Sequence, residues 1–346
     1  MRKLIIVVII FVYMVFPVHA MEFTAPEVPE SGREMFPEKR STFGEDLTYI
    51  LQKALREFQP AMVKTIKVCC GVLSASLMIS IFGTLSGNNS KSAELGGTIV
   101  IAGLLIQSTG TLIRLGTNTV FELSQYGKLL IPVMTAALAA QGGTTASTGL
   151  FAATVLFDGI LTSLISKLLI PIVYIYLALA VAHSAIGQNI LQKLLKFIKS
   201  LMTWCLKTIL YVFTGYISIT GVISGSVDAA AIKAAKLTIS GVVPVVGGIL
   251  SDASEAVLVS AGMMKSAAGI YGILSFVAIG IGPFLQIAAQ YLLLKGTSAV
   301  TAIYEGKKLS ALVEEFSTVM GFVLGMTGAT AFILMISTVC FMRGIG

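Results

Sequence analysis

The stretch Gly241-Val-Val-Pro-Val-Val-Gly-Gly-Ile-Leu-Ser-Asp-Ala-Ser-Glu255 is too apolar for a surface loop, yet a proline, paired glycines and two carboxylates interrupt it as a membrane helix. Irregular backbone in hydrocarbon leaves amide groups without hydrogen-bond partners, so it persists only where protein buries it or water lines it. The stretch therefore predicts a broken membrane segment. Such a segment either lines a path or lets helices pack closely.

The composition of the chain indicates a polytopic, all-α membrane protein. Of its 346 residues, 55% are hydrophobic and 12% are charged, whereas soluble proteins carry about 25% charged residues. Its apolar runs are long enough to cross a lipid bilayer. The net charge is +7, but the sequence contains no soluble basic domain that could bind phosphate groups. We therefore expect the positive charges in lysine-rich loops that face cytoplasmic lipid. We expect no nucleic-acid partner.

The first 20 residues have the pattern of a signal peptide. Arg2 and Lys3 precede an apolar run, and Val18-His19-Ala20 supplies small residues for cleavage. An uncleaved N-terminal anchor is the alternative interpretation. In both cases the segment that follows is exported, so we expect the mature N-terminus on the extracytoplasmic side.

Residues 21–59 predict an exported linker followed by an amphipathic helix, and residues 60–346 predict the membrane domain. The helix is expected to begin at a capping box formed by Thr42 and Glu45. Its apolar face would pack on the membrane or on a partner protein.

The hydropathy pattern predicts six full spans, two fold-back segments and one interfacial helix. The spans are expected at about residues 62–81, 95–113, 160–182, 205–223, 268–294 and 318–341. The interfacial helix begins near Gln188, and four lysines share one of its faces: Lys193, Lys196, Lys199 and Lys207. A loop is expected between residues 113 and 129, and a cytoplasmic linker over residues 295–317.

The fold-backs are predicted at residues 129–157 and 242–264, as re-entrant loops or pairs of short helices. If residues 129–157 crossed the bilayer once, the lysine-rich helix would lie outside the cell, against the positive-inside rule. A segment that turns back on itself places these lysines in the cytoplasm. The chain then contains two copies of one plan, namely a span, a broken segment and a returning span.

Paired broken segments in corresponding halves point to a translocation site in membrane proteins. The candidate pathway residues are Gln141, Gly142, Gly143, Pro244, Gly247, Gly248, Ser251, Asp252 and Glu255. Ionisable side chains within apolar stretches are further candidates, because they are costly unless paired or hydrated. These are Asp158, Lys167, Asp228, Lys233, Lys236 and Lys265. Helix capping and ion pairs within the bundle would also explain them.

Enzymatic functions lack their reacting groups in this sequence. No HExxH, GxGD, GxSG or P-loop motif is present, so we expect no metalloprotease, intramembrane protease or ATPase activity. The four cysteines lie in apolar stretches without a CxxC motif, and signal-peptide cleavage would leave His183 as the last histidine. We therefore expect no metal site and no cofactor.

Several blocks in a fixed order resemble the stage III sporulation protein AE family. They are Leu130-Ile-Pro-Val-Met-Thr-Ala-Ala-Leu-Ala-Ala-Gln-Gly-Gly143, residues 229–236, Val243-Pro-Val-Val-Gly-Gly-Ile-Leu-Ser-Asp-Ala253 and Lys265. The resemblance covers about residues 60–345, and its most specific element runs from Pro244 to Asp252. It supplies no catalytic or binding residues.

The resemblance implies a permease-like subunit of a channel complex that links mother cell and forespore and sustains late forespore gene expression. It implies a place in the mother-cell-derived membrane around the forespore. The implied partners are the other proteins of the stage III A operon, including a secretion-type ATPase and ring-forming subunits, and the forespore stage II sporulation protein Q. A structural platform for partner subunits and a stand-alone secondary transporter are the alternative functions.

Overall fold

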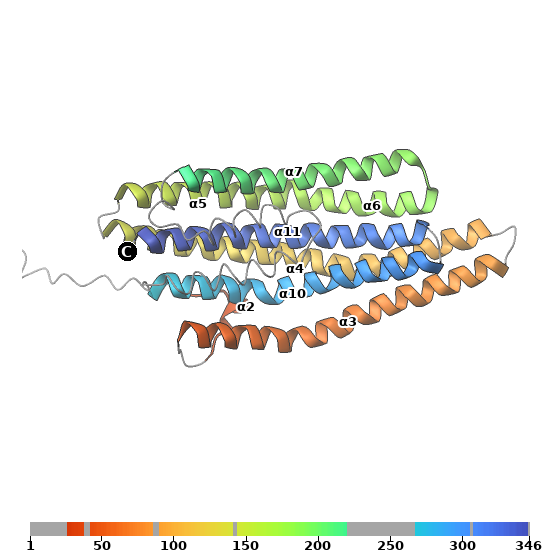
Figure 1. The fold of residues 1–346 in the computed structure, drawn as a ribbon, viewed down its shortest axis with the longest axis horizontal. Coiled ribbons are helices and arrows are strands. Elements are labelled where there is room, and N and C mark those ends of the chain that lie inside the picture. The colour runs from red at the N-terminus through yellow and green to blue at the C-terminus, as the bar shows by residue number, and fades with distance from the viewer. Residues whose placement is uncertain are drawn as a thin grey trace, which may run out of the picture.

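The computed structural model describes residues 26–37, 42–85, 90–140, 144–219, 267–304 and 307–344, and within these ranges all regular secondary structure is helical. Six of the helical stretches are long and apolar enough to cross a membrane. They lie roughly side by side in an elongated bundle (Figure 1). The prediction of an all-α, multi-pass membrane protein is therefore confirmed, with six candidate spans among the described residues.

The first two long helices are longer than the sequence predicted. Helix α3 runs from Phe43 to Leu85 and α4 from Ser90 to Ala140. At about 1.5 Å per residue, α4 is about 76 Å long, more than twice the hydrocarbon thickness of about 30 Å. The expected boundary between an amphipathic helix and a first span is absent within α3. The loop expected after residue 113 is likewise wrong, because these residues are the middle of α4.

Packing explains why these helices do not break at their charged residues. The first half of α3 buries Leu47, Ile50 and Ala54 beside Leu274 and Ala278 of α10. The short helix α2 (Glu30–Arg33) lies on the same helix α10. The predicted capping box is seen in part, since the backbone N–H of Thr42 donates to the Glu45 carboxylate at 3.2 Å. The face that α3 buries against α10 therefore keeps the helix continuous, although polar residues lie on its outer side.

Helices α5 (Thr144–Leu164) and α6 (Ile170–Ile186) form one rod, joined by the π-helical turn η2 (Ile165–Leu169). Gly187 ends this rod with φ of +74°, a conformation that favours glycine, and its N–H donates to the carbonyl of His183 at 2.8 Å. Helix α7 (Asn189–Ile219) then returns antiparallel to α6. The predicted interfacial helix is therefore the first half of α7 and not a separate element.

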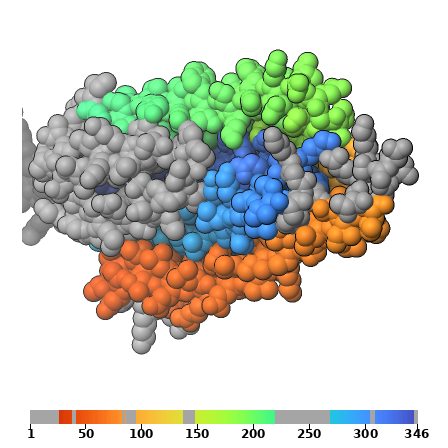
Figure 2. Space-filling view, turned by 45° about the vertical axis from the view of Figure 1, so that its right-hand side comes forward, coloured from red at the N-terminus to blue at the C-terminus, as the bar shows by residue number. Residues whose placement is uncertain are grey.

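The last two helices form the centre of the bundle. Helix α10 spans Ala267–Tyr304 and α11 spans Lys307–Gly344. More than half of the most apolar window of each is buried (56% and 61%), against 22% for α3 and for α7. The linker predicted over residues 295–317 is wrong, because its described residues are the end of α10 and the start of α11. Figure 2 shows these two helices between α7 and α3.

The first predicted fold-back has a different form from the one expected. The chain reverses direction between α4 and α5 (Figure 1), but both arms belong to helices of full spanning length. The reversal is thus the end of a long helical hairpin and not a pair of short helices. Residues 141–143 themselves, and the whole second segment at residues 242–264, lie outside the described residues.

Candidate functional site

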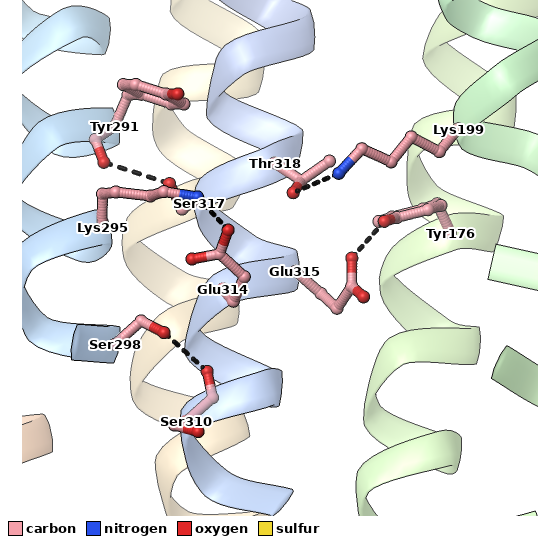
Figure 3. Close-up of polar contacts among 10 residues, drawn as sticks. All are labelled: Tyr176, Lys199, Tyr291, Lys295, Ser298, Ser310, Glu314, Glu315, Ser317 and Thr318. Atoms are coloured by element: carbon pink, nitrogen blue, oxygen red, sulfur yellow. Dashed lines mark hydrogen bonds and ion pairs between the residues drawn. The ribbon is translucent and has the colours of Figure 1, made fainter. Parts of the chain in front are cut away.

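One turn of α11, from Glu314 to Thr318, collects polar contacts from three other helices; we call it the polar turn (Figure 3). Toward α10, Glu314 forms an ion pair with Lys295. The Ser317 hydroxyl donates to the backbone carbonyl of Tyr291 at 3.1 Å. The two central helices are therefore held together by side chains as well as by apolar packing.

On its other side the polar turn reaches the hairpin of α6 and α7. The Tyr176 hydroxyl of α6 donates to the Glu315 carboxylate. The Lys199 ammonium of α7 donates to the Thr318 hydroxyl at 3.5 Å. Four helices thus meet at one turn: Lys295 and Lys199 reach Glu314 and Thr318 on one face of α11, and Glu315 points away from that face toward Tyr176 (Figure 3).

The polar turn extends from the surface of the bundle to its interior. The side chains of Lys295 and Glu314 are 50% and 35% exposed, whereas Tyr176 and Ser317 are buried. An exposed ion pair of this kind contributes little stability in water, about 0–1 kcal/mol. The buried contact between Tyr176 and Glu315 is stronger, because a hydrogen bond to a charged group contributes about 1.5–3 kcal/mol.

A second polar contact lies between α4 and α5. Asp158 is 3% exposed, and the Ser124 hydroxyl donates to its Oδ2 atom at 2.6 Å. Its Oδ1 atom has no partner among the described residues, and neither has the buried hydroxyl of Thr162 one turn further along α5. Buried polar groups are costly unless they are hydrogen-bonded. Asp158 is thus an incompletely satisfied polar group inside a candidate span.

The π turn η2 separates these two polar sites along one rod. Asp158 faces Ser124 on α4, whereas Tyr176 faces Glu315 on α11. Eighteen residues make five full α-helical turns, so an unbroken α-helix would point both side chains the same way. The extra residue of a π turn rotates the following helix by about 100°. This rotation allows one rod to contact two different neighbours.

Six of the candidate residues predicted from the sequence lie in the described part of the chain. Asp158 is buried, Lys167 is exposed on η2, and the side chains of Lys193 and Lys196 are exposed on α7. The other two α7 lysines differ from these: Lys199 contacts the polar turn and Lys207 is half-buried. Outside the described residues lie Gln141, Gly142, Gly143, Asp228, Lys233, Lys236, Pro244, Gly247, Gly248, Ser251, Asp252, Glu255 and Lys265.

The sequence did not predict the polar turn. Lys295, Glu314 and Glu315 were assigned to a linker, and Tyr176 lies in one of the most apolar runs of the chain. A paired Glu-Glu directly before an uncharged run was the available signal. Within the described ranges, no group of three or more His, Cys, Asp or Glu side chains is placed to hold a metal ion.

Comparison with known proteins gives one consistent result. Residues 34–344 match the family described as stage III sporulation protein AE. The stage III sporulation protein AE of Bacillus subtilis (strain 168) is 23% identical over 206 residues, which cover 58% of this chain and 51% of that protein. The chain thus spans about half the length of the curated relative it matches. No solved structure matches it. Because the family match covers most of the chain, this protein belongs to the stage III sporulation protein AE family, a family of sporulation membrane proteins.

Proposed function

We propose that the chain is the permease-like membrane subunit of a channel or secretion complex between mother cell and forespore, required for late forespore development and gene expression. Its family and its six candidate spans support a place in a sporulation membrane. The polar turn carries the proposal. Ionisable side chains where four candidate spans meet are costly in lipid, so they point to a functional route through the bundle.

The proposed setting follows from the family. The subunit would lie in the mother-cell-derived membrane around the forespore, with its mature N-terminus extracytoplasmic. Its proposed partners are the other stage III A-operon proteins, including the secretion-type ATPase and the ring-forming subunits, with stage II sporulation protein Q on the forespore side. The ATPase would supply the energy for transport.

Glu315→Gln tests this function, because it keeps the shape of the side chain and removes its charge. We expect the complex to assemble normally, as measured by co-purification of its partners, while a late forespore reporter gene loses expression. Glu57→Gln, an exposed change on α3, is the matched control and should affect neither measurement. Normal reporter expression in the Glu315→Gln strain would contradict a route through the polar turn.

A structural platform is the second candidate, and the exposed lysines at the start of α7 favour it. Reversal of charge at Lys193 and Lys196 should then dissociate the partners, whereas Glu315→Gln should have no effect. An intact complex after charge reversal argues against the platform. Uptake of solute by the purified protein alone would instead support a stand-alone transporter.

A further inference from the structure

Three helices carry an uncharged stretch of nearly the same length. Residues 68–85 of α3, 95–113 of α4 and 168–186 of η2 and α6 contain no Asp, Glu, Lys or Arg. At about 1.5 Å per residue each stretch is about 27–29 Å long, which matches the hydrocarbon thickness of about 30 Å. We call these three stretches the apolar flank. Its exposed side chains include Met78, Phe82, Ile99, Val100, Leu104 and Ile175.

Each uncharged stretch ends at an exposed basic residue: Lys67, Arg114 or Lys167. The contact between Ser124 and Asp158 fixes the register of α4 against α5. Arg114 lies ten residues before Ser124, and Leu168, the residue next to Lys167, lies ten residues after Asp158. Because the chain reverses direction between α4 and α5, both counts lead toward the same end of the bundle. Arg114 and Lys167 therefore lie at the same height along the bundle. Long basic side chains extend from an apolar surface to lipid headgroups. Arg114 and Lys167 therefore mark one edge of the hydrocarbon layer.

The polar turn lies within the depth of this layer. A Cβ atom on Gly116 of α4 would lie 2.3 Å from Val323 of α11, so these two residues are level. The two helices run in the same direction (Figure 1). Nine residues before Gly116 lies Gln107, and nine residues before Val323 lies Glu314, so Gln107 and Glu314 lie at the same height along the bundle. Glu314 is thus level with the interior of the stretch 95–113 and not with its end.

Helices α7, α10 and α11 carry charged side chains at this depth, and they lie nearer the viewer than α4, α5 and α6 in Figure 1. Lys199 and Lys295 reach the polar turn directly, and Lys193 and Lys196 precede Lys199 on the same face of α7. We call these four lysines, with Glu314 and Glu315, the charged flank. Charges at such depth are costly in lipid.

We infer that the charged flank lines a water-filled passage at the depth of the hydrocarbon layer and that the passage suits anionic solutes. The inference deepens the proposed function and rests on it for the idea of a conduit. Glu314 is paired with Lys295, and Glu315 accepts a hydrogen bond from the Tyr176 hydroxyl. Lys193, Lys196 and Lys199 form no ion pair among the described residues. Lysine-lined pores favour anions.

Cysteine labelling at matched depth tests this inference in the full-length protein. The four native cysteines are replaced, and single cysteines are placed at Lys196 and Glu314 on the charged flank and at Leu104 and Ile175 on the apolar flank. Membranes from sporulating cells are treated with water-soluble thiosulfonate reagents, one anionic and one cationic. Labelling after denaturation and the amount of full-length protein in the membrane confirm that each variant inserts.

We expect the charged-flank cysteines to react at least about tenfold faster than the apolar-flank cysteines, because the reactive thiolate forms only where water is present. The anionic reagent should react faster than the cationic one at Lys196→Cys. Equal labelling of both flanks would show that this level lies outside the hydrocarbon and would overturn the inference. Protection of the charged flank would do so as well, since lipid or a partner protein then covers it.

Two further outcomes distinguish the preference for anions, the hydrated surface and the proposed function from one another. Equal rates for the two reagents would overturn the preference for anions and leave the hydrated flank intact. Normal forespore gene expression in the Glu315→Gln strain, together with a labelled charged flank, would contradict the proposed function and not the water-filled surface.

Discussion

Asp158 shows what a carboxyl group requires inside a membrane bundle. The hydrogen bond from Ser124 at 2.6 Å satisfies one of its oxygens, while the other has no partner within the described part of the chain. Loss of that single donor would leave the whole group unsatisfied. Ser124 therefore matters for stability although it carries no charge.

We predict that Ser124→Ala lowers the free energy of unfolding by about 1–3 kcal/mol, the cost of leaving a buried polar group without its partner. Asp158→Asn should have a smaller effect, because the amide oxygen can still accept the hydrogen bond from the Ser124 hydroxyl. Thermal unfolding of the detergent-solubilised protein measures both. Ser163→Ala, at an exposed position on α5, is the control. Equal melting temperatures for Ser124→Ala and this control would contradict the prediction.

Helix α4 approaches α11 closely because it carries glycine at the points of contact. A Cβ atom on Gly116 would lie 2.3 Å from Val323, and one on Gly127 would lie 2.5 Å from Leu334. Small residues let membrane helices pack at short distance. In contrast, a Cβ atom on Gly103 of the same helix would meet nothing within 4 Å.

We predict that Gly116→Ala and Gly127→Ala each destabilise the protein by about 1–3 kcal/mol through overpacking. Gly103→Ala should leave stability unchanged or raise it by up to about 1 kcal/mol, because alanine favours the helix more than glycine does. The three melting temperatures, measured in one detergent, provide the comparison. If Gly103→Ala were as harmful as the other two, contact with α11 would not be the reason for glycine on α4.

Hydropathy predicted the number of candidate spans among the described residues but not the lengths of the helices. Lys64 and Lys67 in α3, and Arg114 in α4, resemble the ends of spans in the sequence, although both helices continue through them. Continuity depends on packing against α10 and α11, which follow more than a hundred residues later in the chain. The π turn η2 has no signal in the sequence beyond Pro171 just after it.

At the scale of the whole molecule, hydrogen bonds at the polar turn join the hairpin of α6 and α7 to helix α11. Tyr176 and Lys199 belong to the hairpin of α6 and α7, and their partners Glu315 and Thr318 belong to α11. The sequence predicted Lys199 as a candidate because of its charge. Its partner is 119 residues away, a pairing that no local pattern contains. Asp158 was predicted in the same way, and its partner Ser124 was not.

We predict that the double variant Tyr176→Phe, Lys199→Met loosens the two hairpins and lowers the stability of the protein by about 1.5–3 kcal/mol, chiefly through the lost bond to the charged Glu315. Tyr174→Phe with Lys196→Met is the matched control, since both side chains are exposed. Thermal unfolding and cross-linking between single cysteines on α7 and α11 measure the effect. A control variant as unstable as the test variant would contradict it.

The central position of α10 and α11 has a consequence for biosynthesis. Helix α11 packs against α4, α5, α6, α7 and α10, yet it is the last of the described helices to leave the ribosome. Helices α3 to α7 therefore enter the membrane before the helices that cover their inner faces exist. During that interval Asp158 can already bond to Ser124 of α4, whereas Tyr176 has to wait for Glu315 of α11. A premature stop before α10 therefore removes the centre of the bundle together with the partner of Tyr176.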